Sequence, residues 1–287
     1  MKIQVNNLNF GYKNLAVLNI NDATFEKGKA YGIVGKNGVG KTTFFKCLVN
    51  IITNYKGQVL IDGQDVRNNP QLLGKVGIVL DDMSLYKNRT GLFNLRYFIG
   101  LRGTFDEEKV MSLARELEIV DFLSYKVSKY SLGMVKKLHL LISLVDNAEI
   151  LIFDEPFRGL DEQSVGWFRN YLLKLKNQGK TILISSHVQD DIEAISDVAL
   201  LLEKGDFVRE FDLNDASQEF QYMVVVNDIG EAVTILNALN MPYQQEEQKI
   251  YFTAFEDEYR VFFKKAIEQG IEFDQIKKEL LINKLVK

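Results

Sequence analysis

The stretch from Gly35 to Thr43 has the residue types and spacing that bind phosphate groups. It reads GKNGVGKTT and fits the pattern G-x-x-x-x-G-K-[ST], with a strand-like run before it and a helix-like run after it. Glycines let the backbone curl tightly enough for several N–H groups to converge on a phosphate, and the N-terminus of the next helix adds its own. An ordinary glycine-rich turn is the alternative, and the full pattern between strand and helix argues against it.

The same stretch predicts a nucleoside triphosphate as the ligand. Lys41 can reach the β- and γ-phosphates, and the hydroxyl of Thr42 is placed to bind Mg²⁺. The residues that we predict to contact the nucleotide are Gly35, Asn37, Gly38, Gly40, Lys41, Thr42 and Thr43.

A pair of carboxylates follows a second strand-like run. Residues 150–153 are apolar, and Asp154 and Glu155 come at the C-terminal end, where parallel sheets bind ligands. We predict that Asp154 binds Mg²⁺, directly or through a water, beside Thr42. Glu155 is then the candidate base for the water that attacks the γ-phosphate. The alternative is a solvated acidic loop before Pro156, and a preceding phosphate loop disfavours it.

A third strand-like run ends in Leu183-Ile184-Ser185-Ser186 and is followed by His187, one of two histidines in the chain. A histidine at a strand end can hydrogen-bond a γ-phosphate or its attacking water, so His187 is a further catalytic candidate. A lone histidine is more often a surface or structurally satisfied residue, and this alternative stays open.

The composition is that of an ordinary globular protein. Hydrophobic residues make up 46% of the chain and charged residues 26%, and the net charge of −4 gives no basic footprint for nucleic acid. Cys47 is the only cysteine, so we expect a reducing compartment. No signal core opens the chain, and no run approaches the ~18 apolar residues that span a bilayer. We expect a cytoplasmic protein without direct membrane insertion, which another protein would have to hold at a membrane.

Five short aliphatic runs predict strands that are buried on both faces. They are residues 31–34, 76–80, 150–153, 181–185 and 198–202. Interleaved with helices, such runs are typical of a parallel sheet covered on both sides, so the expected fold class is α/β. From about residue 215 the pattern becomes β-α-β-β-α, which suits a ferredoxin-like unit. We predict a nucleotide-binding domain at 1–214 and a small α+β domain of accessory or regulatory role at 215–287.

Five motifs in order give the chain its resemblance to the ATP-binding cassette (ABC) ATPases. They are GKNGVGKTT at 35–43, YSLGM at 130–134, ILIFDE at 150–155, GLD at 159–161 and SSH at 185–187. The resemblance extends from Met1 to Glu210. It implies a P-loop NTPase fold with an antiparallel β subdomain and a helical subdomain. It also implies ATP as the nucleotide, Mg²⁺ as the cofactor and ATP hydrolysis as the activity.

The resemblance implies roles for residues outside the phosphate loop. Tyr12 matches the aromatic residue on which adenine stacks. Ser131 and Gly133 match the signature motif, which completes the nucleotide site of a second subunit, and Asp161 matches the loop that crosses between subunits. Ser131 is also suited to cap the following helix and aim its N-terminus at a phosphate. Two chains, identical or related, would enclose two ATP molecules head to tail.

The chain departs from the family pattern at several positions. Leu132 and Met134 replace a glycine and a glutamine of the usual signature. Asp81 stands where a glutamine usually senses Mg²⁺ and the membrane partner, so Asp81 is a candidate metal ligand. Arg158 stands where small polar residues are common, and the sequence suggests only a solvent-facing guanidinium for it.

These departures resemble one exporter branch, whose ATPases pair with separate six-helix permeases. The resemblance implies a membrane permease as partner, docking through residues 83–102, and a location at the inner face of the cell membrane. The aromatic residues of that stretch suit a docking surface and the core of a helical subdomain equally.

Two other functions remain as alternatives to a transport motor. One is an ABC-type ATPase that acts on DNA or ribosomes, which the single cassette and the acidic net charge disfavour. The other is a regulatory module that binds nucleotide and hydrolyses it poorly. The joint presence of Lys41, Glu155 and His187 disfavours it.

Overall fold

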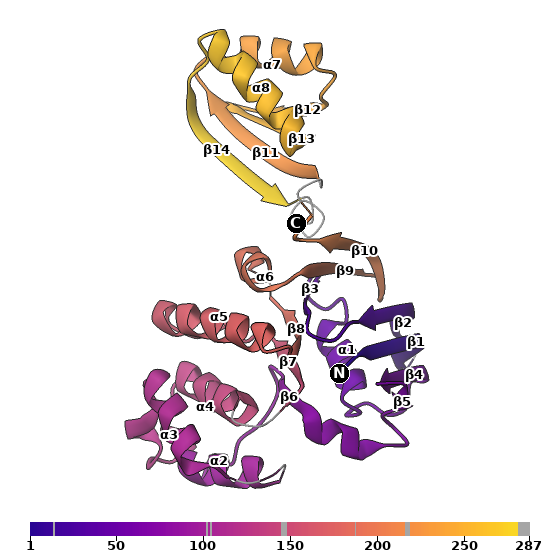
Figure 1. The fold of residues 1–287 in the computed structure, drawn as a ribbon, viewed down its shortest axis with the longest axis vertical. Helices are drawn as coiled ribbons and strands as arrows, with labels where there is room; N and C mark the ends of the chain where they lie inside the picture. The colour runs from indigo at the N-terminus through magenta and orange to yellow at the C-terminus, as the bar shows by residue number, and fades with distance from the viewer. Residues whose placement is uncertain are drawn as a thin grey trace. The chain divides into compact units, whose positions relative to one another are not determined.

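Two compact units make up the chain, Met1–Asp212 and Leu213–Lys287. The computed structural model describes residues 1–13, 15–101, 103, 105–144, 148–186, 188–215 and 219–280 (Figure 1). No helix in these ranges is long and apolar enough to cross a bilayer.

A six-stranded sheet forms the centre of the first unit. Its strands lie in the order β10-β9-β3-β8-β7-β6. Their bounds are β3 Ala30–Val34, β6 Val76–Val79, β7 Ile150–Asp154, β8 Thr181–Ser185, β9 Val198–Glu203 and β10 Asp206–Asp212. All pairs are parallel except β9 with β10, and every residue of β3, β7 and β8 is buried. This mostly parallel and buried sheet confirms the predicted α/β class. Strands that are aliphatic along their whole length need helices or a second sheet on both faces.

Helices cover this sheet, and α1 lies on the opposite side from α5 and α6 (Figure 1). Their bounds are α1 Lys41–Leu48, α2 Gly91–Gly100, α3 Glu107–Glu116, α4 Leu132–Leu144, α5 Glu162–Asn177 and α6 Gln189–Ile195. Three 3₁₀ segments accompany them: η1 Pro70–Lys75, η2 Val120–Phe122 and η3 Val127–Lys129. The helices α2, α3 and α4 form the helical subdomain that the resemblance implied. Side chains at the N-caps of α2 and α3, Thr90 and Asp106, accept backbone N–H bonds that the helices leave unpaired.

An antiparallel sheet packs beside the central one. Its order is β2-β1-β4-β5, with bounds β1 Ile3–Tyr12, β2 Leu15–Phe25, β4 Lys56–Ile61 and β5 Gln64–Asp65. The apolar core between the two sheets includes Phe25 from β2 and the neighbouring Phe44 and Phe45 of α1, all fully buried. The helix that begins at the phosphate loop is therefore held in place by a large aromatic core.

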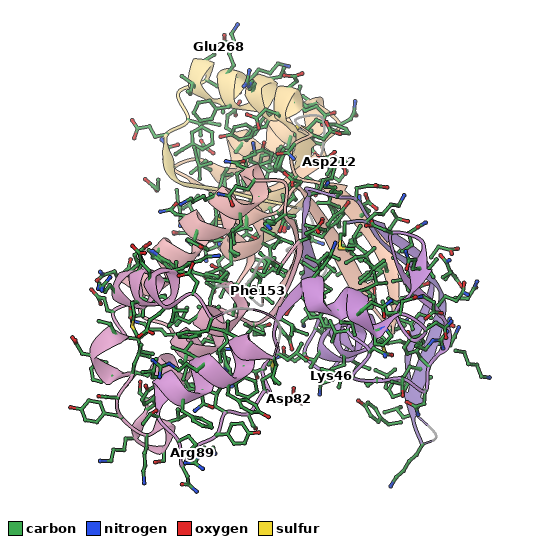
Figure 2. The ribbon with its side chains drawn as sticks, turned by 60° about the horizontal axis from the view of Figure 1, so that its bottom comes forward. Lys46, Asp82, Arg89, Phe153, Asp212 and Glu268 are labelled. Atoms are coloured by element: carbon green, nitrogen blue, oxygen red, sulfur yellow. The ribbon has the colours of Figure 1, made fainter. Side chains whose placement is uncertain are left out.

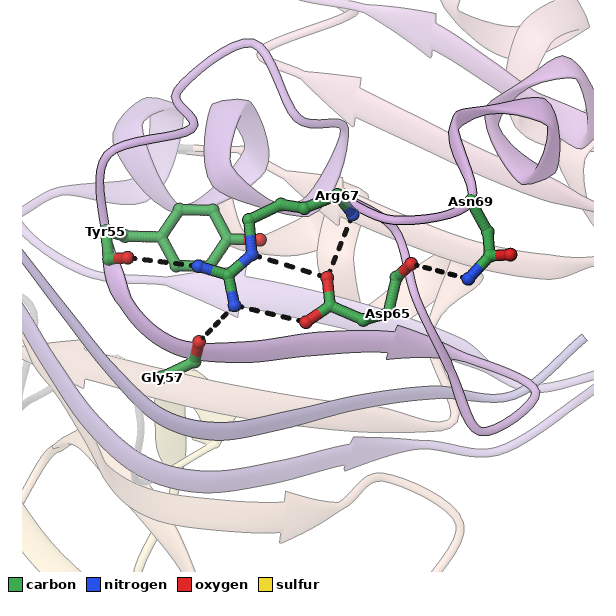
Figure 3. A network of polar contacts seen from close by, with 5 residues as sticks. All are labelled: Tyr55, Gly57, Asp65, Arg67 and Asn69. Carbon is green, nitrogen blue, oxygen red and sulfur yellow. Dashed lines mark hydrogen bonds and ion pairs between the residues drawn. The ribbon is translucent and has the colours of Figure 1, made fainter.

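Arg67 ties the last two strands of the antiparallel sheet to the segment before them (Figure 3). Its guanidinium donates to the carbonyl oxygens of Tyr55 and Gly57 at 3.3 and 2.6 Å and to both carboxylate oxygens of Asp65 at 3.3 and 3.1 Å. It also lies 4.7 Å from the centre of the Tyr55 ring. One partly buried side chain thus satisfies two carbonyls and a carboxylate.

Replacing Arg67 with methionine should destabilise the first unit by about 2 kcal/mol, because the two carbonyls lose their side-chain donor and the carboxylate of Asp65 keeps only the backbone N–H of residue 67. In thermal unfolding, domains of this size shift by about 2–4 °C per kcal/mol. Arg96→Met is the matched control, since Arg96 is 55% exposed and pairs only with Glu107 among the ion pairs of the described residues. If both variants lowered the unfolding temperature equally, the hydrogen bonds of Arg67 would contribute no more to stability than an exposed ion pair does.

The second unit is a small α+β fold with one four-stranded sheet. Its elements are β11 Glu219–Val226, α7 Ile229–Ala238, β12 Tyr243–Glu246, β13 Lys249–Phe255, α8 Glu256–Glu268 and β14 Phe273–Leu280. The sheet order is β12-β13-β11-β14, and all pairs are antiparallel. This is the β-α-β-β-α-β order of a ferredoxin-like fold, and β14 is the strand that the sequence analysis did not predict. Both helices contribute to its core, with Leu236 from α7 and Phe262 from α8 fully buried.

Candidate functional site

A cavity of about 500 Å³ lies where β3 and β7 end in the first unit. It is lined by Asn37, Gly38, Gly40, Lys41, Thr42, Thr43, Asp81, Asp154, Glu155 and Arg158. The structure therefore brings together the phosphate loop, the acidic pair at the end of β7 and Asp81. The volume is in the range of small-ligand sites in proteins.

The phosphate loop takes backbone conformations that glycine provides. Gly38 and Gly40 have φ angles of 79° and 118°, in the region that L-residues with a side chain rarely adopt. Gly40 is the N-cap of α1, and a Cβ there would lie 3.0 Å from a methyl carbon of Leu18. The residues at the start of α1 line the cavity. The first backbone N–H groups of a helix have no partner within the helix and are suited to bind anions.

Lys41 is held by the loop that it follows. Its ammonium donates to the carbonyl oxygens of Gly35 at 2.6 Å and Lys36 at 3.2 Å, and the residue is 7% exposed. Burial lowers the pKa of Lys41, and the carboxylates of Glu155 and Asp154 partly oppose that shift. A phosphate beside the ammonium would add a further negative charge that favours its protonated form.

Asp154 joins the phosphate loop to the neighbouring strand. One carboxylate oxygen accepts from the hydroxyl of Thr42 at 2.5 Å, and the other accepts from the hydroxyl of Ser185 at 2.6 Å. The side chain is 1% exposed. A hydroxyl and a carboxylate in contact offer hard oxygen atoms of the kind that would suit Mg²⁺. No cluster of three or more His, Cys, Asp or Glu ligands occurs among the described residues.

Glu155 follows with a left-handed backbone, φ 47°. Its N–H bonds to both the carbonyl and the hydroxyl oxygen of Ser185, each at 3.1 Å. Few residues other than glycine adopt this conformation, and such strain gathers at functional sites. The turn places the Glu155 side chain on the cavity wall beside Lys41 and Thr42.

Comparison with known proteins decides the family. A family model described as "ABC transporter" matches residues 18–158. The bacitracin transport ATP-binding protein BcrA of Enterococcus faecalis is 35% identical over 218 residues, which cover 74% of this chain and 70% of that protein. The chain belongs to the ABC transporter ATP-binding proteins. It is an ABC ATPase subunit, and the DNA- or ribosome-associated alternative is not favoured.

Two further comparisons concern a relative in sequence and a solved structure. The lantibiotic transport ATP-binding protein SrtF of Streptococcus pyogenes is 28% identical over 219 residues, covering 76% of this chain and 94% of that protein. A solved dimeric ATP-binding cassette in a post-hydrolysis state, bound to ADP and Pi, matches with a TM-score of 0.68 at 22% identity. That match covers 74% of this chain and 99% of the cassette, and it shows a shared fold.

Arg158 of the ABC subunit makes a contact that the sequence analysis did not predict. Its side chain is exposed, as predicted, and it also lines the cavity and donates to a carboxylate oxygen of Asp81 at 3.2 Å. The other oxygen of Asp81 lies 3.5 Å from the ammonium of Lys136 in α4. The sequence could not reveal this cluster, because Asp81 is separated from Arg158 by 77 positions and from Lys136 by 55.

Five predicted site residues do not line this cavity, and a sixth lies outside the described residues. The five are Tyr12, Gly35, Ser131, Gly133 and Asp161. Tyr12 ends β1, is 52% exposed and packs edge-on against Phe10. His187 is the residue that lies outside the described part of the chain.

The signature residues and Asp161 meet within one chain of the ABC subunit. Ser131 accepts from the backbone N–H of Met134 at 3.2 Å, so the predicted cap on α4 is present. A Cβ on Gly133 would lie 2.7 Å from the carbonyl oxygen of Gly159, which explains a glycine there. Asp161 caps α5 and lies 3.0 Å from the ammonium of Lys137 in α4. These contacts fix the start of α4 against the start of α5.

Proposed function

We propose that this ABC subunit hydrolyses ATP to drive an exporter, acting in pairs on a separate membrane permease. The cavity that joins the phosphate loop, Asp154 and Glu155 carries the proposal. The relatives named as bacitracin and lantibiotic transport proteins favour outward transport. The chain would then work at the inner face of the cell membrane, held there by the permease.

The proposed roles follow from the contacts in the cavity. Lys41 and the N–H groups at the start of α1 bind the phosphates of ATP. Thr42 and Asp154 hold Mg²⁺, which neutralises phosphate charge when bound, and Asp81 remains a candidate for its outer ligands. Glu155 orients a water and takes its proton. Tyr12 stacks on adenine, and His187 contacts the γ-phosphate or the water.

The exposure of the signature residues supports a site completed by a second subunit. Ser131 is exposed, and the side chain of Leu132 is 66% exposed at the start of α4. A helix N-terminus capped by serine and open to solvent is suited to bind the phosphate of a facing chain. We propose that two chains close head to tail on two ATP molecules, with Asp161 near the junction.

A cluster of exposed aromatic side chains on the helical subdomain is the proposed docking surface for the permease. It consists of Tyr86, Phe93 and Tyr97, which are 47%, 39% and 40% exposed. Their rings touch, with centroids 5.1 to 6.1 Å apart, and the guanidinium of Arg89, which Figure 2 labels, lies 5.1 Å from the Phe93 ring. Packing in a helical core, the alternative in the sequence, would bury these rings. Exposed aromatics with an arginine are typical anchors of protein interfaces.

Asp81 gives the proposed docking region a physical link to the nucleotide. It lines the nucleotide cavity and also a second cavity of about 530 Å³, whose wall includes Met83, Leu85 and Tyr130. The next residue, Asp82, pairs with Lys46 of the helix that follows the phosphate loop (Figure 2). We propose that the segment beginning at Asp81 and Asp82 transmits changes at the nucleotide to the permease. The C-terminal unit has an accessory or regulatory role in this proposal.

Replacing Phe93 and Tyr97 together with serine should release the chain from membranes, because the aromatic anchors are lost. The measurement is the share of the chain that sediments with washed membranes from its native cells, and we expect a fall of about tenfold. ATP hydrolysis by the isolated variant should stay within about twofold, since neither side chain lines the nucleotide cavity.

The matched control is Phe122→Ser, an aromatic residue 42% exposed elsewhere on the helical subdomain. This variant should sediment like the unchanged chain. Membrane binding that survives the double substitution would contradict the proposed docking surface.

A further inference from the structure

We propose that Arg158 binds the terminal phosphate of ATP in its own chain, and that this contact breaks its ion pair with Asp81. The nucleotide cavity would then distinguish ATP from ADP through one arginine. The inference goes beyond the proposed export function, since it concerns how the cavity recognises its nucleotide.

The position of Arg158 supports a contact in the same chain. It lies in the turn between β7 and α5, three residues after Glu155, and its N–H donates to the Glu155 carbonyl oxygen at 3.4 Å. Gly159 follows with φ 85°, which turns the chain back toward α5. This turn places the guanidinium on the wall of the cavity that also contains Lys41 and Glu155.

The charges that line the cavity favour a second cation near the phosphates. Its described lining includes three carboxylates, of Asp81, Asp154 and Glu155, and two cationic side chains, Lys41 and Arg158. A terminal phosphate beside Asp154 and Glu155 meets repulsion that a nearby cation reduces. Arginine suits this task, because its planar group donates two parallel hydrogen bonds to phosphate oxygens.

The ion pair that Arg158 would leave is weak. The Arg158 side chain is 62% exposed and that of Asp81 is 42% exposed, and exposed ion pairs contribute little to stability. Asp81 would not be left without a partner, because Lys136, with its side chain 6% exposed, lies 3.5 Å away. The exchange therefore leaves no charge unpaired.

The exchange would change the environment of α4. With ADP bound, the carboxylate of Asp81 pairs with both Arg158 and Lys136. With ATP bound, it pairs with Lys136 alone. Asp81 and Lys136 both line the second cavity, beside the proposed docking region. The consequence for a permease rests on the proposed function, whereas the phosphate contact does not.

The test compares the affinities of ATP and ADP for the full chain in the Glu155→Gln background, which prevents turnover. Binding is measured by calorimetry without added Mg²⁺, so that Asp81 cannot act through a metal ion, and at concentrations where light scattering shows a monomer. Arg158→Gln should weaken ATP binding about tenfold and change ADP binding by less than about twofold. Asp81→Asn, which frees Arg158, should leave ATP binding as tight or tighter.

Two outcomes would overturn the proposal. Equal losses for ATP and ADP in Arg158→Gln would show that the arginine does not contact the terminal phosphate. A loss of ATP affinity in Asp81→Asn equal to that in Arg158→Gln would show that ATP binding needs the intact ion pair, and not an Arg158 that has left it. Arg96→Gln, another exposed arginine paired with one carboxylate, is the control and should alter neither affinity. Failure of membrane binding would leave this comparison of nucleotides unaffected.

Discussion

The Glu155→Gln variant should keep ATP bound and lose turnover by about a hundredfold or more. Glutamine keeps the size of the side chain and the backbone bonds from residue 155 to Ser185, but its amide cannot accept the proton of the attacking water. Phosphate release measures turnover, and the nucleotide recovered from the protein identifies what is bound. In ATP the variant should accumulate as a dimer in size-exclusion chromatography with light scattering.

The control for this variant is Glu162→Gln, an exposed carboxylate in the first turn of α5. It changes the net charge equally and lies outside the residues that line the cavity. Its turnover should stay within about twofold of the unchanged chain. Unchanged turnover in Glu155→Gln would rule out the assignment of Glu155 as the base.

Replacing Lys41 with methionine should weaken ATP binding by about a hundredfold. The ammonium is the buried cation of the phosphate loop, and methionine keeps the stem while removing the charge that contacts the phosphates. Equilibrium binding of a fluorescent ATP analogue measures the loss, and circular dichroism checks that the variant is folded.

Lys46→Met is the matched control for Lys41, since both lysines belong to α1. Lys46 pairs with Asp82 and does not line the cavity. The affinity of the Lys46→Met variant for ATP should therefore stay within about threefold of that of the unchanged chain. A Lys41 variant that binds ATP as tightly as this control would contradict the phosphate-loop assignment.

The strands that carry the site were predictable because each is an aliphatic run that ends in polar residues. The prediction for residues 181–185 coincides with β8, and that for 150–153 falls short of β7 by Asp154 alone. These runs are buried on both faces, so hydrophobicity alone marks them. The turn from β3 into α1 follows in the same way from the glycines between them.

The antiparallel sheet was harder to predict. The strand β2, Leu15–Phe25, was missed because Asn19, Asn21 and Asp22 interrupt it, and these residue types are depleted in strands. Pairing with β1 over nearly its whole length overrides that preference. Tertiary pairing of this kind leaves no local pattern for a single sequence to show.

The polar contacts across the site were the least predictable part. The ion pair of Asp81 with Arg158 joins the ends of two different strands, and neither residue has a neighbour in sequence that indicates it. The same holds for Ser185, whose hydroxyl orients Asp154 from the next strand. Motifs identify which residues carry chemistry, whereas strand order determines which of them meet.

The most direct test of the transport assignment is to purify the chain from native membranes in mild detergent and identify its companions by mass spectrometry. Our account predicts a membrane protein with several spanning helices, in a fixed ratio to this chain, that is lost from the Phe93 and Tyr97 double variant. Recovery with ribosomes or nucleic acid, and no membrane protein, would contradict it.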